Sequence, residues 1–143
     1  MDIDIIIPIY NAFDFVKKCI ETVIEHTDLT QHTLLLVNDK STDERILPLL
    51  NSFIKENQSL NIILIDNKDN QGFVRTVNIG MQYSHHDVVL LNSDTEVTRN
   101  WLSKIQNCAY SKPAVATVTP LSNNATLASV PIFLAENTIP PGR

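Results

Sequence analysis

The chain has 143 residues, enough for one domain with a hydrophobic core, and its apolar fraction of 43% is ordinary for a globular protein. Its formal net charge of -5 argues against a nucleic-acid-binding protein, which would usually carry a basic face. The sequence has no apolar run near the ~18 residues that a transmembrane segment needs, and its start lacks the features of a secretory signal. Only two cysteines occur, Cys19 and Cys108, and we expect both as buried, reduced thiols in a cytoplasmic protein.

Short apolar runs rich in β-branched residues alternate with segments of helical periodicity. The runs lie at 5–7, 34–37, 62–65, 88–91 and 115–118. They are continuous rather than alternating in polarity, which is typical of strands that are covered on both faces. The resulting order βαβαβαβαβ predicts a Rossmann-like α/β fold, with a mostly parallel sheet and helices on both faces.

Four helices are expected between and after these strands. Their apolar stripes lie at 13–24, 46–54, 73–81 and 101–109. Asn11 is a candidate N-cap for the first helix, and Thr98 for the fourth. The second is expected to follow Ser41 and Glu44, which have the spacing of a capping box. Pro48 should either kink this helix or delay its regular part.

The composition changes near the end of the chain. From Pro120 onward Asn, Ser, Thr and Pro dominate, and the chain stops at Arg143 without a capping element. We therefore expect an α/β domain at 1–119, followed at 120–143 by a loop or the start of a further part. A truncated chain is the favoured interpretation of this ending, and a natural flexible tail is the alternative.

Polar and acidic residues follow each of the first four strands. These segments lie at 8–11, 38–39, 66–72 and 92–94. The carboxyl ends of parallel strands meet at one edge of an open α/β sheet, and ligands bind there. Carboxylates gathered at one edge repel each other unless a cation or a donor-rich ligand joins them. The sequence therefore predicts a binding site at this edge.

The common phosphate-binding loops are missing from the sequence. No G-x-G-x-x-G follows the first strand and no G-x-x-x-x-G-K-S/T occurs, which argues against a dinucleotide oxidoreductase and a P-loop protein. A bound diphosphate would then need a divalent cation, Mg²⁺ or Mn²⁺, to bridge a carboxylate and the phosphate oxygens. Asp94, in an Asn-x-Asp arrangement after the fourth strand, is the leading candidate ligand for that cation.

Four segments together resemble a known family. They read IIIPIYNAFDFVKKCI, LLLVNDKSTD, NIILIDNKDNQGFVRTVNIG and DVVLLNSDTEVTRNWL. In order and spacing they are similar to the nucleotide-binding half of family-two glycosyltransferases with the GT-A fold. The segment VTPLSNNATLASVP is also similar to one in bacterial members that act on cell-surface polysaccharide. The resemblance implies an inverting transfer from a nucleotide-diphosphate sugar, with a UDP-sugar favoured, to a polysaccharide or lipid-linked glycan.

The resemblance also implies roles for the matching positions. Pro8, Tyr10 and Asn11 would line the pocket for base and ribose. Asp39 would accept a hydrogen bond from the imide N–H of uracil, and such a donor ligand would explain an otherwise costly buried carboxylate. Asp94 would hold Mg²⁺ or Mn²⁺ on the diphosphate, where the metal stabilises the leaving nucleoside diphosphate.

Two positions depart from the family pattern. The aspartate-x-aspartate motif reads N-S-D at 92–94, so Asn92 can hydrogen-bond a ribose or sugar hydroxyl but brings no charge. Many members carry an arginine where this chain has Val77, and the nearby Arg75 is our candidate for a phosphate contact. Asn70 is included among the nucleotide-sugar-binding residues, although it also fits a turn-forming role.

The catalytic base of the family, a carboxylate on the acceptor side, has no match in this chain. We therefore expect the chain to be truncated before the acceptor-binding part, to bind donor, and to be inactive alone. A full-length protein would be cytoplasmic or peripheral at the inner face of the membrane. Two alternatives compete with this interpretation. A sugar-nucleotide pyrophosphorylase would need a basic glycine-rich loop after the first strand, which residues 8–11 do not offer. A non-catalytic nucleotide-binding or protein-interaction module would have structural roles for Asp39 and Asp94.

Overall fold

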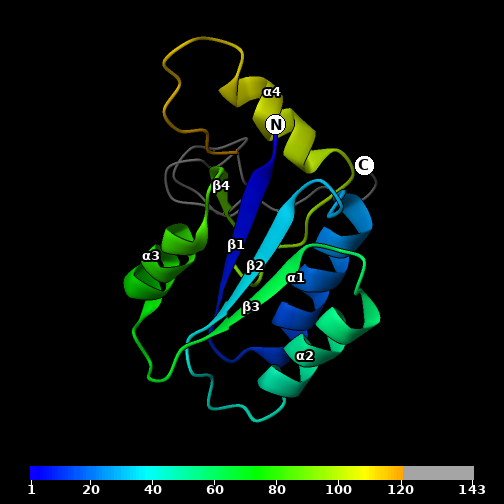
Figure 1. Ribbon diagram of the computed structural model, residues 1–143, viewed down its shortest axis with the longest axis vertical. Helices are drawn as coiled ribbons and strands as arrows, with labels where there is room; N and C mark the ends of the chain where they lie inside the picture. The colour runs from blue at the N-terminus through cyan, green and yellow to red at the C-terminus, as the bar shows by residue number, and fades with distance from the viewer. Residues whose placement is uncertain (121–143) are drawn as a thin grey trace, which may run out of the picture. The chain divides into compact units, whose positions relative to one another are not determined.

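A computed structural model describes residues 1–120 of the chain, of which Met1–Asn100 forms one compact unit. Its strands are β1 (Ile3–Ile9), β2 (Thr33–Asn38), β3 (Ile62–Asp66) and β4 (Asp87–Leu90). They form one parallel sheet in the order β3-β2-β1-β4. The connecting helices are α1 (Phe13–His26), α2 (Ile46–Glu56) and α3 (Phe73–Tyr83). Helices α1 and α2 cover one face and α3 the other (Figure 1), so the predicted α/β fold is confirmed.

The two central strands form the core because side chains on both of their faces are covered. Successive residues of a strand point to opposite faces. Ile6, Leu35 and Val37 pack in one cluster, against which Ile79 of α3 lies. A methyl group on Gly80 would lie 2.7 Å from Cγ2 of Ile6, so only glycine lets α3 approach the sheet this closely.

The first two helices begin differently from the predicted capping patterns. Ala12 occupies the N-cap position of α1 and Arg45 that of α2, and neither helix has a side-chain capping hydrogen bond. The predicted capping roles of Asn11 and Ser41 are therefore wrong: the Asn11 N–H donates to the Ser41 Oγ at 2.9 Å, which joins two loops. Pro48 lies in the first turn of α2, where its missing N–H costs no intrahelical hydrogen bond. The helix begins at Ile46, after the predicted capping box, which agrees with the expectation that Pro48 delays its regular part.

The second unit starts at Trp101, and the structure describes it up to residue 120. It contains the predicted helix, α4 (Trp101–Ala109). The predicted strand at 115–118 is wrong, because this described segment has no regular secondary structure. β-branched residues form a strand only when a neighbouring strand pairs with their backbone. Cys108 is exposed, contrary to expectation, whereas Cys19 is buried as expected.

Two further expectations concern the chain as a whole. The segment 121–143 lies outside the described residues, so the expected division at residue 120 stays a prediction. Among the described helices, none combines the length and the apolar character that a membrane span requires.

Candidate functional site

A cavity lies at the carboxyl ends of β1 and β2, on the face of the sheet that α3 covers. Its volume is about 310 Å³, within the range of small-molecule pockets. The residues around it are Pro8, Ile9, Tyr10, Asp39, Asn70, Gly72, Phe73 and Thr76. The structure therefore brings together four of the predicted binding residues, from β1, the end of β2 and the β3–α3 loop. This is the edge where open α/β folds bind their ligands.

Asp39 makes the most hydrogen bonds in the cavity wall. Its Oδ1 accepts the N–H of Gln71 at 2.7 Å and the Nδ2–H of Asn67 at 2.9 Å. Its Oδ2 accepts the N–H of Gly72 at 2.8 Å, and the residue is only 4% exposed. Burial by itself raises the pKa of Asp39, but these hydrogen bonds outweigh it and hold the pKa below its usual value. Asp39 is therefore an ionised, internally paired carboxylate.

These contacts change the interpretation of Asp39. A donor ligand is not needed to explain its burial, contrary to the argument from sequence, because the protein itself supplies the donors. Nor does Asp39 simply bond its own turn: its partners Gln71 and Gly72 lie 32 and 33 residues further along the chain. The carboxylate holds the β3–α3 loop at the start of α3, so a substitution here changes stability as well as any ligand affinity.

Several residues of this region were not among the predicted binding residues, and three of them have a clear role in it. Asn67 and Thr76 are buried and support Asp39, with the Nδ2 of Asn67 also 3.3 Å from the Oγ1 of Thr76. Phe73, the first residue of α3, lines the cavity and is 60% exposed. Tyr10, which also lines the cavity, is 49% exposed. Asn67 follows a predicted strand end, which was a usable signal, whereas nothing in the sequence distinguished Phe73 from a core residue.

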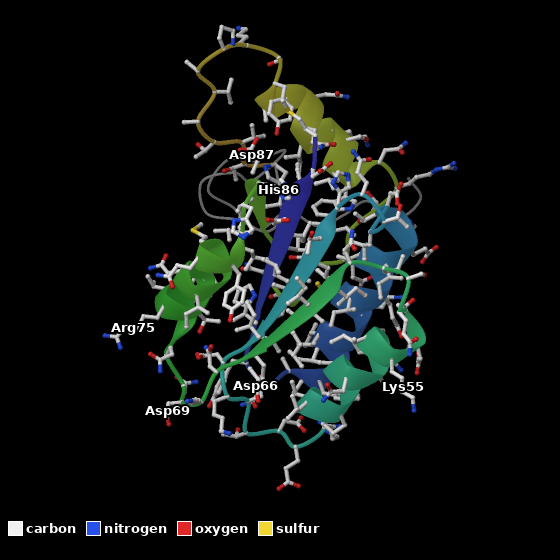
Figure 2. The ribbon with its side chains drawn as sticks, in the orientation of Figure 1. Lys55, Asp66, Asp69, Arg75, His86 and Asp87 are labelled. Carbon is white, nitrogen blue, oxygen red and sulfur yellow. The ribbon has the colours of Figure 1, made fainter. Side chains whose placement is uncertain are left out.

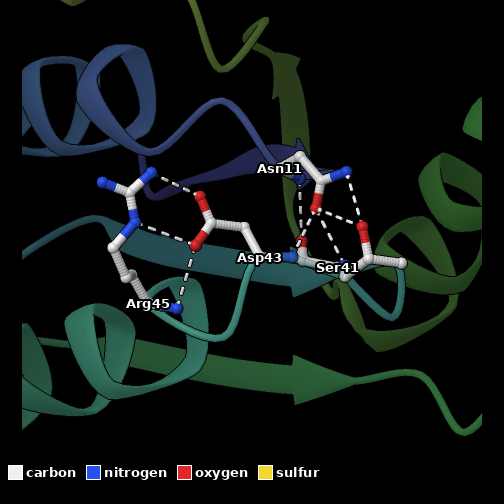
Figure 3. A network of polar contacts seen from close by, with 5 residues as sticks. Asn11, Ser41, Asp43 and Arg45 are labelled. Carbon is white, nitrogen blue, oxygen red and sulfur yellow. Dashed lines mark hydrogen bonds and ion pairs between the residues drawn. The ribbon is translucent and has the colours of Figure 1, made fainter.

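Asn11 is not among the cavity-lining residues. Its Oδ1 accepts the backbone N–H groups of Thr42 at 2.8 Å and Asp43 at 2.9 Å, across from the β1–α1 turn to the β2–α2 loop. Figure 3 shows this network, with the side chain of Asn11 directed at the loop. The side chain of Asn11 therefore contacts the β2–α2 loop rather than the cavity.

The remaining predicted residues lie outside the cavity wall. The N–H of Leu91 donates to the carbonyl of Ile6 at 2.9 Å, which keeps the chain beside β1 as it leaves β4. Asn92 and Asp94 follow at the carboxyl edge of the sheet, and both are exposed. Arg75 is exposed on α3 and points away from the sheet (Figure 2).

Cys19 lies beneath the segment that follows β4. Its Sγ is 3.6 Å from the carbonyl oxygen of Asn92. Burial raises the pKa of the Cys19 thiol to about 12, and the negative charge of Asp94 adds to the effect. The Cys19 thiol is therefore neutral.

The described residues do not form a complete set of metal ligands at this edge by themselves. Within residues 1–120 there is no group of three His, Cys, Asp or Glu side chains arranged to hold a metal. Asp94, an exposed carboxylate, would by itself leave most coordination positions to water and phosphate oxygens. Mg²⁺ is commonly bound in this way, through one or two carboxylates plus substrate phosphates.

Comparison with known sequences gives a family. The profile described as "Glycosyl transferase family 2" matches residues 4–130. Polypeptide N-acetylgalactosaminyltransferase 11 of Xenopus tropicalis is 31% identical over 104 residues, which are 71% of this chain and 17% of that protein. Poly(ribitol-phosphate) beta-glucosyltransferase of Bacillus spizizenii is 33% identical over 73 residues, 50% of this chain and 11% of that protein. The chain thus spans under a fifth of the length of either relative.

Solved structures share the fold. Mannosyltransferase PcManGT of Pyrobaculum calidifontis, in complex with GDP-Man and Mn²⁺, has a TM-score of 0.71 at 17% identity, covering 78% of this chain and 32% of that one. S. aureus TarS 1–349, in complex with UDP-GlcNAc, has a TM-score of 0.62 at 18% identity, covering 74% of this chain and 30% of that one. With the family profile matching most of its length, the chain belongs to glycosyltransferase family 2 and has a GT-A type of fold.

Proposed function

We propose that this chain is the donor-binding part of a glycosyltransferase that uses a nucleotide-diphosphate sugar. The observation that carries the proposal is the cavity at the carboxyl edge, with the Asp39 carboxylate in its wall and two exposed aromatic side chains, Tyr10 and Phe73, around it. Solved structures of the same fold support it, because one is a complex with GDP-Man and Mn²⁺ and another is a complex with UDP-GlcNAc.

The cavity suits the base of the nucleotide. Tyr10 and Phe73 offer aromatic rings on which a planar base can stack, and Pro8 adds apolar wall. The Oδ2 of Asp39 accepts the N–H of Gly72, and a carboxylate oxygen has room for a second donor. The imide N–H of uracil is such a donor, and we favour a UDP-sugar on this basis together with the family resemblance.

The diphosphate is proposed to lie nearer β4. Chain order reverses between β1 and β4, and the crevice at such a point is where nucleotides bind in open α/β sheets. Asp94 would hold Mg²⁺ or Mn²⁺ there, and Asn92 would hydrogen-bond a ribose or sugar hydroxyl. The metal, when bound, supplies positive charge that stabilises the leaving diphosphate. Arg75, which points away from the sheet, has no part in this proposal.

The transfer itself is proposed to need residues outside this chain. In an inverting reaction the acceptor hydroxyl oxygen attacks the anomeric carbon, the bond from that carbon to the diphosphate breaks, and a base takes the hydroxyl proton. We propose that a carboxylate beyond this chain is that base, so the chain alone binds donor without transferring sugar. The proposed acceptor is a bacterial cell-surface polysaccharide or lipid-linked glycan, reached from the cytoplasm at the inner face of the membrane.

A non-catalytic nucleotide-binding or protein-interaction module is the second candidate. The internal hydrogen bonds of Asp39 favour it, because they give this carboxylate a structural role that needs no ligand. The two candidates differ in whether the cavity binds nucleotide and whether that binding depends on a metal.

Calorimetric titration of UDP into matched aromatic variants tests the proposed base site. Tyr10→Ala and Phe73→Ala should each weaken UDP binding about tenfold, because a base–aromatic stack contributes about 1–3 kcal/mol. The controls are Tyr83→Ala and Phe15→Ala, which remove similarly exposed rings outside the cavity wall and should bind UDP as the wild type does. Equal losses in test and control variants would contradict the base site, and failure of the wild type to bind UDP, GDP or dTDP would contradict the function.

A further inference from the structure

The turn between β1 and α1 has an unusual backbone. Asn11 has φ of 58° and Ala12 has φ of 56°, so two consecutive non-glycine residues are left-handed. The left-handed conformation costs roughly 1–2 kcal/mol for an ordinary residue, although asparagine tolerates it better than most. Ala12 has no polar side chain to offset this cost. Such a turn persists only when the surrounding structure holds it.

The side chain of Asn11 supplies that hold. Its Oδ1 accepts the backbone N–H groups of Thr42 and Asp43 at 2.8 and 2.9 Å, and its Nδ2 donates to the Oγ1 of Thr42 at 3.1 Å. Its backbone N–H donates to the Oγ of Ser41 at 2.9 Å (Figure 3). One residue therefore joins the β1–α1 turn to a loop that lies 30 to 32 residues later in the sequence.

The far end of this loop is tied back to α1. The carboxylate of Asp43 accepts two hydrogen bonds from the guanidinium of Arg45, at 2.7 and 2.9 Å. That guanidinium lies over the ring of Phe13, the first residue of α1, at 4.5 Å from the ring centroid. The loop from Ser41 to Arg45 is thus attached at its start to Asn11 in the β1–α1 turn, and at its end to Phe13 in the first turn of α1.

This cross-link is adjacent in sequence to two residues of the cavity wall. Tyr10 immediately precedes Asn11, and Asp39 precedes Ser41 by two positions, with the left-handed Lys40 between them. Both acceptor positions of the Asn11 carbonyl are filled by backbone N–H groups, so this oxygen has no position left for a ligand.

We propose that Asn11 is a positioning residue: it fixes Tyr10 relative to Asp39 and so pre-forms the candidate base site without touching the ligand. The inference rests on the proposed function, since it concerns how that site binds a nucleoside diphosphate. It replaces the direct ligand role that the sequence suggested for Asn11. Pre-forming a site raises affinity because less ordering is needed when the ligand binds.

Two variants of Asn11 separate positioning from contact. Asn11→Asp keeps an acceptor oxygen for Thr42 and Asp43 and tolerates a left-handed backbone, but it removes the amide donor. Asn11→Ala removes the acceptor as well. Asn51→Ala is the matched control, since it removes an exposed asparagine that bonds only within α2, to the carbonyl of Leu47.

The experiment uses the full 143-residue chain, at a temperature where circular dichroism shows every variant folded. Amide hydrogen exchange at Thr42 and Asp43 reports the cross-link, and calorimetric titration with UDP reports the site. Asn11→Ala should lose protection at both amides and bind UDP about tenfold more weakly, as a site that must be ordered on binding does. Asn11→Asp and Asn51→Ala should keep both the protection and UDP affinity close to that of the wild type.

Other outcomes overturn the inference in distinguishable ways. If Asn11→Asp keeps the protection but loses UDP affinity, the amide of Asn11 contacts the ligand directly. If Asn11→Ala loses protection while UDP affinity is unchanged, Asn11 anchors the loop and has no effect on the site. If the wild type binds no nucleoside diphosphate at all, the proposed function itself fails and this inference fails with it.

Discussion

Replacing Asp39 with asparagine tests whether this carboxylate holds the β3–α3 loop in place. The substitution keeps the size of the side chain and removes its charge. One oxygen can still face the donors Gln71 and Asn67, but the new amide NH₂ then faces the N–H of Gly72, and two donors cannot bond each other. The variant therefore loses the hydrogen bond from Gly72. Its hydrogen bonds from Gln71 and Asn67 remain but no longer go to a charged acceptor.

The size of the effect follows from these contacts. A hydrogen bond to a charged group contributes about 1.5–3 kcal/mol, and a buried donor left without a partner costs about 1–3 kcal/mol. We therefore expect Asp39→Asn to lower the free energy of unfolding by about 2–4 kcal/mol. For a chain of this length the melting temperature should fall by about 6–12 °C.

Urea and thermal unfolding, followed by circular dichroism, measure this loss. Asp69→Asn is the matched control: it makes the same chemical change at an exposed position of the same loop and should alter stability by less than about 0.5 kcal/mol. Because the pKa of Asp39 is lowered in the folded protein, its contribution is complete above its unfolded pKa, near pH 4. The gap between wild type and Asp39→Asn should therefore shrink as the pH falls below about 4. Equal stability of the wild type and Asp39→Asn at neutral pH would refute the role of Asp39 in holding the loop.

Two further predictions concern stability. Gly80→Ala should lower the free energy of unfolding by about 1–3 kcal/mol, because its methyl group meets Cγ2 of Ile6 at 2.7 Å; urea midpoints close to those of the wild type would show that α3 shifts at little cost. Asp4, buried at the opposite end of the sheet from the candidate site, accepts hydrogen bonds from the Ser84 Oγ at 2.7 Å and the His85 N–H at 3.1 Å. Burial raises the pKa of Asp4, but its hydrogen bonds outweigh this and lower it, so Asp4→Asn should cost about 1–3 kcal/mol at neutral pH and less as the pH falls below about 4. A stability difference that stays constant from pH 7 to pH 3 would contradict the assignment of that acid sensitivity to Asp4.

Local periodicity correctly predicted the helices and four of the five expected strands. Continuous apolar runs of strand length predicted parallel strands with helices on both faces, and residues after those strands pointed to the carboxyl edge where Pro8, Tyr10 and Asp39 line a cavity. These predictions succeed because burial patterns and chain order are properties of neighbouring residues. The strand expected at 115–118 does not form. A strand also needs a neighbouring strand to pair with, and local composition does not show whether one is present.

The polar contacts of the site could not be predicted in the same way. Asn11 and Ser41 have the residue types of helix caps, yet they bond each other across 30 positions of sequence. Asp39 finds its donors in a loop whose path depends on the docking of α3, and that docking depends in turn on Gly80 against Ile6. Such contacts are set by the tertiary fold, and the spacing of residues in the sequence does not predict them.

The proposed function requires the chain to bind a nucleoside diphosphate through a metal held by Asp94. Calorimetric titration of UDP in Mn²⁺, then in EDTA, with wild type and Asp94→Asn, tests it most directly. We expect binding by the wild type in Mn²⁺ only, and little or none by Asp94→Asn, at an unchanged melting temperature because this side chain is exposed. Binding that is equally strong in EDTA, or in Asp94→Asn, would contradict the metal-dependent site.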